Sequence, residues 1–170
     1  ERVLVIDDHS PDGTGAIAED LAAARSGMRV LHRPRKEGLG RAYADGFRQV
    51  LASTAVERVV QMDVDFSHPP ERLPDLLAAL GQADLVLGSR YIHGGATHNW
   101  GLGRRLISRF ASLYARGWLG LPVRDLTGGY KAWRRVLLEQ VLARPIAASG
   151  YAFQVETTYV AHRLGARIAQ

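Results

Sequence analysis

The sequence contains no cysteine, and this absence excludes disulfide bridges and metal sites built on thiolates. It is compatible with a reducing compartment. No apolar run approaches the roughly 20 residues that a membrane-spanning helix needs. Internal repeats, low-complexity tracts and linkers are also missing. A chain of 170 residues, 46% of them hydrophobic, is therefore expected to form one compact domain over residues 1–170.

Acidic residues are scarce in one part of the chain. The formal net charge is +5, which suggests an anionic partner, and between residues 90 and 135 nine Arg and Lys side chains accompany one acid. Aromatic and aliphatic residues are interleaved with these cations on a helix expected at about 103–119, where Arg104 and Ser108 lie one turn apart. The helix has either an ordinary basic solvent face or a surface that binds an anion. Single-stranded nucleic acid is a non-enzymatic alternative for such a pattern.

The stretch from Val59 to Glu71 begins as a buried strand and ends in polar residues and two prolines, which suit the first turn of a helix. Asp63 and Asp65 are two residues apart, so on an extended chain they point the same way, and Ser67 continues that face. Two close carboxylates repel each other unless a cation or proton intervenes, and oxygen ligands suit Mg²⁺ or Mn²⁺. Two other interpretations stay open: a strand end with solvated aspartates, and an aspartyl nucleophile of the haloacid dehalogenase type.

Short apolar runs that alternate with helical patterns predict a β-α-β-α-β-α-β order and hence an α/β fold with a mostly parallel sheet. In such sheets, ligands bind at the carboxyl ends of the strands, where this chain has carboxylates, cations and glycines. The expected strands include residues 3–6, 28–32, 59–62 and 84–90, and the expected helices about 15–25, 39–52, 70–81 and 152–164.

Two loops near the N-terminus carry candidate ligand contacts. Asp7 and Asp8 follow the first strand and precede Thr14, a good helix cap. Each acid is either a ligand contact or a turn former, and we favour contact for at least one. Lys36 and Gly38 precede the second helix, where cations and backbone N–H groups can hold a phosphate. A glycine-rich turn with solvated charges is an equal alternative.

Two later segments complete the predicted sheet edge. Arg90 ends the strand that starts at about residue 84, at the same edge as Asp63. Residues 125–133 are predicted to be a loop that enters an edge strand. Their paired glycines, Gly128 and Gly129, stand next to aromatic residues, which indicates a close backbone approach to a ligand or to another strand.

Six motifs occur together and in a fixed order, and together they resemble the dolichol- or polyprenol-phosphate mannosyltransferases of glycosyltransferase family 2 over about residues 1–165. They are Asp7-Asp8-x-Ser-Pro-Asp-Gly-Thr, Gly38-Leu39-Gly40-x-Ala42-Tyr43, Met62-Asp63-x-Asp65-x-Ser-His-Pro-Pro-Glu71, Gly88-Ser89-Arg90-Tyr91, Arg104-x3-Ser108-Arg109 and Asp125-x-Thr-Gly-Gly129-Tyr130. His9 and Ser112 are departures, since the family commonly has Asn at both positions. The resemblance implies the GT-A fold, a Rossmann-like three-layer arrangement of a mostly parallel sheet flanked by helices. It also implies that the opening strand and a C-terminal segment are missing, so we expect a piece of a longer protein.

The resemblance further implies an enzyme that moves mannose from GDP-mannose to a polyprenyl or dolichyl phosphate with inversion, assisted by Mg²⁺ or Mn²⁺. A related transferase that uses UDP-glucose or another nucleotide sugar is the first alternative, and nucleotide-sugar binding without turnover is the second. The motif order disfavours the phosphatase, which usually has its nucleophilic aspartate early. No nucleic acid is expected as a partner. The expected location is the cytoplasm, at the cytoplasmic face of a membrane, reached through the surface of residues 100–119, an anchoring partner or a lost C-terminal anchor.

Residue roles follow from the same resemblance. Asp7 and Asp8 would lie beside the nucleotide, and Asp63 and Asp65 would hold the metal on its diphosphate. The full expected set comprises donor contacts from Asp7, Asp8, Lys36, Gly38 and Asp63, a metal site of Asp63, Asp65 and Ser67, an acceptor phosphate site of Arg90, Arg104 and Ser108, and catalytic roles for Asp65, Arg90 and Arg104.

Overall fold

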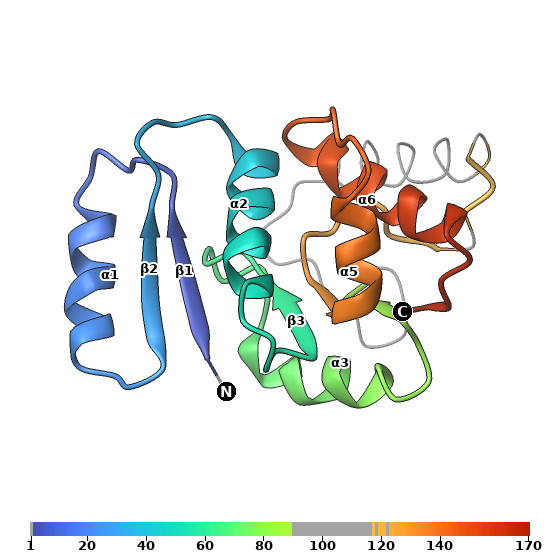
Figure 1. Ribbon diagram of the computed structural model, residues 1–170, viewed down its shortest axis with the longest axis horizontal. Helices are drawn as coiled ribbons and strands as arrows, with labels where there is room; N and C mark the ends of the chain where they lie inside the picture. The colour runs from blue at the N-terminus through green and yellow to red at the C-terminus, as the bar shows by residue number, and fades with distance from the viewer. Residues whose placement is uncertain (1, 90–116, 118, 122) are drawn as a thin grey trace. The chain divides into compact units, whose positions relative to one another are not determined.

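The computed structural model describes residues 2–89, 117, 119–121 and 123–170. Within these ranges strands alternate with helices, which confirms the predicted α/β class (Figure 1). None of the helices in these ranges is long and apolar enough to cross a membrane. Contacts divide the chain into two compact units, residues 1–55 and 56–170. A single catalytic domain over residues 1–170 stays a prediction.

The first unit has the predicted β-α-β-α order. It contains β1 (Val3–Asp7), α1 (Thr14–Ala23), β2 (Met28–His32) and α2 (Leu39–Leu51). The two strands pair in parallel with Asp7 opposite His32, and the two helices lie on opposite sides of them (Figure 1). Parallel pairing places the carboxyl ends of both strands at one edge, so the loops that follow them are neighbours.

Residue types explain the two helices of this unit. Tyr43 and Phe47 are four residues apart on α2 and both buried, and their rings stack with centroids 5.8 Å apart. Helix α1 begins at Thr14, and Thr14 is not its cap, which corrects the prediction. The carboxylate of Asp12 instead accepts the N–H of Thr14 at 3.1 Å and its hydroxyl at 2.6 Å, so Asp12 satisfies this N–H at the helix start.

The second unit contains one sheet with the strand order β3-β5-β4-β6. Its elements are β3 (Arg58–Gln61), the 3-10 turn η1 (Pro70–Arg72), α3 (Leu73–Ala79), β4 (Leu85–Leu87), β5 (Lys131–Arg134), α5 (Arg135–Leu142), α6 (Tyr151–Arg163) and β6 (Ile168–Ala169). Strand β5 is antiparallel to β3 and β4, whereas β4 and β6 are parallel. Strands β3, β4 and β6 therefore run in one direction, as a mostly parallel sheet requires.

The position of β5 corrects the prediction of an edge strand. It lies between β3 and β4, with Trp133 opposite Val59 on one side and Leu85 on the other. Lys131 and Trp133 are each 0% exposed. A charged residue such as Lys131 is typical of an exposed edge, and here its ammonium is instead satisfied inside the unit.

Two helices also differ from the prediction. The helix expected at about 70–81 is a 3-10 turn followed by α3, which begins at Leu73 with Pro74 in its first turn, where a proline is tolerated. Helix α5 was not predicted, although its buried Leu137, Leu138 and Val141 have helical spacing.

The core of the second unit is a buried cluster of residues from α3, β4 and the chain that enters β5. Its members are Leu76, Leu80, Ala83, Val86, Tyr130 and Ala132. Tyr130 is 4% exposed, so its ring has a fixed position where the chain enters β5.

Lys131 joins β5 to α6 through three hydrogen bonds. Its Nζ donates to the main-chain oxygen of Gln154 at 2.7 Å, to Thr158 Oγ1 at 2.9 Å and to Thr157 Oγ1 at 3.3 Å. These acceptors match the three N–H groups of an ammonium. Burial nevertheless lowers the pKa of Lys131 from 10.5 to about 7, and the negative charge of Asp125 opposes this shift.

This buried lysine is expected to make stability depend on pH. The unfolded chain keeps the Lys131 proton up to its ordinary pKa of 10.5, whereas the folded chain releases it above about 7, so the free energy of unfolding should rise with pH between these values. The slope should approach at most about 1.4 kcal/mol per pH unit. Urea unfolding of the wild type and of Lys131→Met at several pH values measures it. Equal slopes in the two proteins would contradict the prediction.

Candidate functional site

The loop after β3 carries the predicted metal ligands. Strand β3 ends at Gln61, residues 64–68 form a series of bends, and Phe66 has a φ of +61°. The premise that Asp63 and Asp65 lie on an extended strand is therefore wrong, and their common orientation stays a prediction. A positive φ is uncommon for a residue other than glycine, so contacts of the loop, rather than strand geometry, orient these side chains.

Asp65 is held in its ionised form by Ser67. Its Oδ1 accepts the main-chain N–H of Ser67 at 3.0 Å and the Ser67 hydroxyl at 2.5 Å. These bonds, the hydroxyl first, lower the pKa of Asp65 below its ordinary 3.8. The residue is exposed, so a cation can reach its carboxylate. Ser67, the third predicted ligand, thus lies directly beside the second.

Asp63 is held by two neighbouring segments. Its main-chain N–H donates to His68 Nδ1 at 2.8 Å, and the His68 ring stacks on Tyr130 with centroids 5.0 Å apart. A Cβ at Gly129 would lie 3.0 Å from Asp63 Oδ2. The close backbone approach that the paired glycines predicted is therefore an approach to this loop. Sequence reasoning missed His68, because a histidine between a serine and a proline has no periodic pattern that marks it.

These oxygen donors fit a small divalent cation. Mg²⁺ is commonly bound by one or two carboxylates and completes its coordination with water and substrate phosphate oxygens, and Mn²⁺ also suits oxygen ligands. Within the described ranges, no group of three or more His, Cys, Asp or Glu side chains could enclose a metal. The oxygens of Asp63, Asp65 and Ser67 are of the type that such a cation prefers, and a metal held by them stays a prediction.

In the first unit, Asp8 fixes the loop before α2. Its carboxylate pairs with Arg33 and accepts the N–H of Gly38 at 3.0 Å and that of Glu37 at 3.4 Å. These amides, interpreted from the sequence as phosphate donors, thus bind an anion of the protein itself. Lys36, the preceding residue, is exposed. The fold brings Asp8 and Gly38 together, and their contact with a nucleotide, like that of Lys36, stays a prediction.

Asp7 is buried and forms the turn after β1, and its predicted contact with the nucleotide stays a prediction. Its Oδ1 accepts the N–H of Ser10 at 3.1 Å, and its Oδ2 lies 3.2 Å from His32 Nδ1. Hydrogen bonding from Ser10, and less so from His32, lowers the pKa of Asp7, while burial opposes the shift. His32 Nε2 lies 2.8 Å from Glu19 Oε1, and this contact is the main reason that the pKa of His32 is raised.

The predicted acceptor site lies outside the described residues. This holds for Arg90, Arg104 and Ser108 and for most of the helix expected at about 103–119. Their roles therefore remain predictions that rest on the sequence.

Three cations of the basic segment 90–135 serve the fold rather than a binding surface. Lys131 is buried, and Arg134 donates to main-chain carbonyl oxygens that follow α3. Arg135 pairs with Glu139 at 2.7 Å. The surplus of positive charge counted along the sequence is thus larger than the charge that this segment offers to an anion.

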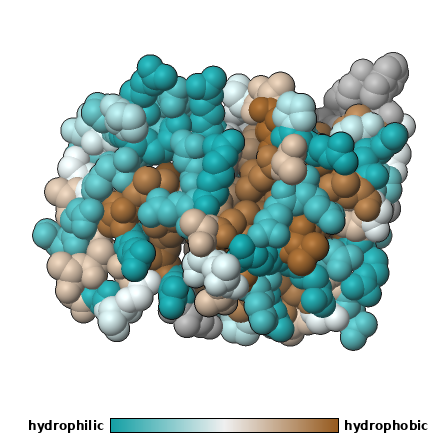
Figure 2. All heavy atoms as spheres, in the orientation of Figure 1, coloured by the Kyte–Doolittle hydropathy of each residue, from teal (hydrophilic) through white to brown (hydrophobic). Residues whose placement is uncertain are grey.

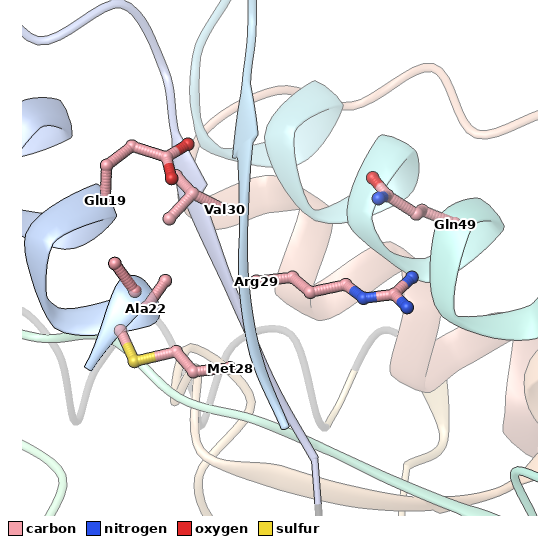
Figure 3. Close-up of a pocket in the computed structure, with 7 residues that line it drawn as sticks. Glu19, Ala22, Met28, Arg29, Val30 and Gln49 are labelled. Atoms are coloured by element: carbon pink, nitrogen blue, oxygen red, sulfur yellow. The ribbon is translucent and has the colours of Figure 1, made fainter. Parts of the chain in front are cut away.

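A shallow hollow lies on the first unit, away from the predicted ligands of that unit. It has a volume of about 390 Å³ and is lined from α1, β2 and α2. Glu19 and Val30 lie on one side of β2, and Arg29 extends toward Gln49 on the other (Figure 3). Hydrophobic side chains reach the surface between α1 and the strands (Figure 2). No residue of the predicted site lines this hollow.

Comparisons with known proteins agree on one family. The family model described as Glycosyl transferase family 2 matches residues 1–142. Undecaprenyl-phosphate mannosyltransferase of Micrococcus luteus is 48% identical over 168 residues, which cover 99% of this chain and 69% of that protein. Polyprenol monophosphomannose synthase of Mycolicibacterium smegmatis is 43% identical over 171 residues, which cover 99% of this chain and 64% of that protein. The chain thus spans 64–69% of the length of these curated relatives.

Solved structures of a glucosyl-3-phosphoglycerate synthase are also similar to this chain. Glucosyl-3-phosphoglycerate synthase from Mycobacterium tuberculosis, in complex with Mn²⁺, uridine diphosphate and phosphoglyceric acid, has 28% identity and a TM-score of 0.67. The match covers 100% of this chain and 57% of that one. A further structure of the same synthase has the same identity and TM-score and is covered to 59%.

Proposed function

Because the chain belongs to glycosyl transferase family 2, we propose that its full-length protein transfers mannose from GDP-mannose to a polyprenyl or dolichyl phosphate with inversion. The observation that carries the proposal is the 48% identity to undecaprenyl-phosphate mannosyltransferase over 99% of this chain. The name of the second relative, polyprenol monophosphomannose synthase, supports the same sugar and lipid class. GDP as the nucleotide rests on the resemblance of the sequence motifs.

On the donor side, Asp63, Asp65 and Ser67 would hold Mg²⁺ or Mn²⁺ on the diphosphate of GDP-mannose. The bound cation would supply Lewis-acid stabilisation of the charge that develops on the departing diphosphate. Asp65 contributes an ionised carboxylate that Ser67 orients, and Asp63 a carboxylate that packs against Gly129. The Mn²⁺ in the structure of the M. tuberculosis synthase supports a divalent metal of this kind.

On the acceptor side, the lipid phosphate needs no protein base. A phosphomonoester with a second pKa of about 6 is largely ionised at neutral pH, so its oxygen is already a nucleophile. Arg90, Arg104 and Ser108 position this oxygen against the anomeric carbon, on the face opposite the diphosphate. Attack from that face inverts the configuration of the sugar.

A donor panel with the full-length protein tests the proposal. With polyprenyl phosphate and Mn²⁺ or Mg²⁺, we expect transfer from GDP-mannose in preference to other GDP- and UDP-sugars, and loss of transfer in EDTA. UDP-glucose is the competing donor, since the M. tuberculosis synthase was crystallised with uridine diphosphate. Preferred transfer from UDP-glucose would contradict the assigned donor. Nucleotide-sugar binding without transfer would contradict the enzymatic function.

We expect the full-length protein to reach its lipid substrate at a membrane surface. The net charge of +5 favours anionic lipid, and the apolar and basic segment 100–119, outside the described residues, is the predicted contact. Flotation with liposomes should therefore show binding that increases with the fraction of anionic lipid and decreases with salt. Binding that is independent of salt would argue against an electrostatic contact, and an anchoring partner or C-terminal anchor would then replace it.

A further inference from the structure

The contact between His68 and the main chain of Asp63 determines which ring nitrogen of His68 carries the proton. A main-chain N–H can only donate, so the 2.8 Å contact between Asp63 N and His68 Nδ1 requires an unprotonated Nδ1. The neutral ring with its proton on Nε2 is the form that meets this requirement. The bond closes the loop that carries both predicted metal ligands, from its first aspartate to the residue after Ser67.

The ring of His68 is itself fixed by Tyr130. The two rings are 15° from parallel, with centroids 5.0 Å apart. The Tyr130 hydroxyl donates to the main-chain oxygen of Pro69 at 3.0 Å, so the residue after His68 is held as well. The Tyr130 ring also packs closely on Gly88, the residue after β4, since a Cβ at Gly88 would lie only 2.8 Å from it. The core of the second unit therefore sets the position of the histidine ring.

The carboxylate of Asp63 packs on Gly129, the residue that precedes Tyr130. A Cβ at Gly129 would lie 3.0 Å from Asp63 Oδ2 and 3.2 Å from His68 Cε1, so the acid and the imidazole pack on one glycine. The main-chain oxygen of Gly129 accepts a hydrogen bond from Gln61 Nε2 at 2.9 Å. Gln61 is buried and ends β3, two residues before Asp63. The side chain of Gln61 thus links the end of β3 to Gly129, on which the Asp63 carboxylate packs.

We propose that His68 is a positioning residue of the donor site, whose Nδ1 fixes the main chain at Asp63 so that its carboxylate meets the metal–diphosphate group. The inference rests on the proposed function, since it assumes that Asp63 is a metal ligand. Asp65 is exposed and oriented by Ser67, whereas Asp63 is oriented by a buried frame through His68. Residues that orient metal ligands typically change metal affinity by about 10–100-fold when they are replaced.

Two substitutions at position 68 of the full-length protein separate the acceptor atom from the ring. His68→Asn places a side-chain oxygen near the position of Nδ1 and keeps the acceptor, but removes the ring. His68→Phe keeps a ring that can stack on Tyr130, but has no acceptor. The measured quantity is the affinity for GDP, by isothermal titration calorimetry with MnCl₂ and with EDTA, at a temperature where circular dichroism shows each variant folded.

We expect His68→Phe to weaken Mn²⁺-dependent GDP binding by about 10–100-fold, with the affinity in EDTA unchanged. His68→Asn should recover most of the lost affinity. The kcat of transfer should fall in His68→Phe and return toward the wild-type value in His68→Asn. The KM for polyprenyl phosphate should stay near the wild-type value in both variants. This recovery would not occur if the stacked ring alone maintained the loop.

Three outcomes overturn the inference. Wild-type affinity in folded His68→Phe would show that the acceptor is dispensable. Equal losses in the two variants would show that restoring an acceptor at the position of Nδ1 does not restore binding, so the effect would not lie in the Nδ1 contact. GDP binding by the wild type that does not depend on Mn²⁺ would overturn the proposed metal site itself, and the role of His68 with it.

Discussion

Replacing Asp65 with alanine in the full-length protein is expected to lower the turnover of mannosyl transfer by roughly 10²–10³-fold. Asp65 is ionised, because the N–H and hydroxyl of Ser67 stabilise its charged form, and it is exposed to an incoming cation. If Asp65 holds the metal as proposed, its loss would weaken the stabilisation of the charge on the departing diphosphate in the transition state. The affinity for GDP in the presence of Mn²⁺ should fall in the same variant.

Two further variants define the cause. Asp65→Asn keeps the size and one acceptor oxygen but removes the charge, so most of the activity should still be lost. Asp75→Ala is the matched control, because Asp75 is an exposed acid of the same unit that pairs with Arg72 at 3.1 Å. Such a surface pair contributes little, and activity should stay near the wild-type value. Near-normal turnover by Asp65→Ala would contradict the metal assignment.

The second large effect is expected at Arg104, which lies outside the described residues. If Arg104 and Ser108 grip the lipid phosphate from one helix face, Arg104→Ala should raise the KM for polyprenyl phosphate or lower kcat. The loss of one charge-assisted hydrogen bond corresponds to about 1.5–3 kcal/mol, or roughly ten- to 150-fold. Arg104→Lys should recover only part of this, since an ammonium cannot offer the planar fork of a guanidinium.

Binding of the donor alone distinguishes the two halves of the site. The affinity of Arg104→Ala for GDP-mannose, measured without acceptor, should be nearly unchanged. Arg124→Ala is the control, since Arg124 is exposed and belongs to the same basic segment. Should Arg104→Ala weaken GDP-mannose binding as strongly as it impairs transfer, the arginine would belong to the donor diphosphate instead.

Local sequence patterns predicted most of the helices and strands correctly. Strand β2 spans residues 28–32 as its apolar run indicated, and α2 ends one residue from its predicted limit. The GT-A type of α/β fold is confirmed by the family match and by the structural similarity to the M. tuberculosis synthase. These elements depend on neighbours within a few residues, which a sequence pattern records directly.

The features that could not be predicted depend on contacts between distant segments. Strand β5 is central because Trp133 pairs with Val59 and Leu85, and because Lys131 finds its acceptors on α6. No local pattern shows that a lysine will be satisfied inside the fold, and the prediction of an edge strand here is wrong.

The loop after β3 is a second example, within the candidate site, of a feature that depends on contacts between distant segments. The residue types of Asp63 and Asp65 indicated a metal, and the oxygen donors of the loop fit one. Asp63 is held by His68 and Gly129 and Asp65 by Ser67, rather than by strand alternation. A metal held by Asp63 and Asp65 stays a prediction, whereas the contacts of His68 and Gly129 that support the loop could not be predicted from the sequence.

The measurement that tests the account most directly is the position of Mn²⁺ in crystals of the full-length protein grown with GDP-mannose and MnCl₂. Anomalous scattering from manganese identifies the ion without relying on activity. The account predicts a peak at metal–ligand distance from carboxylate oxygens of Asp63 and Asp65 and from the diphosphate of the bound nucleotide. A bound diphosphate with its manganese peak away from both aspartates would contradict it.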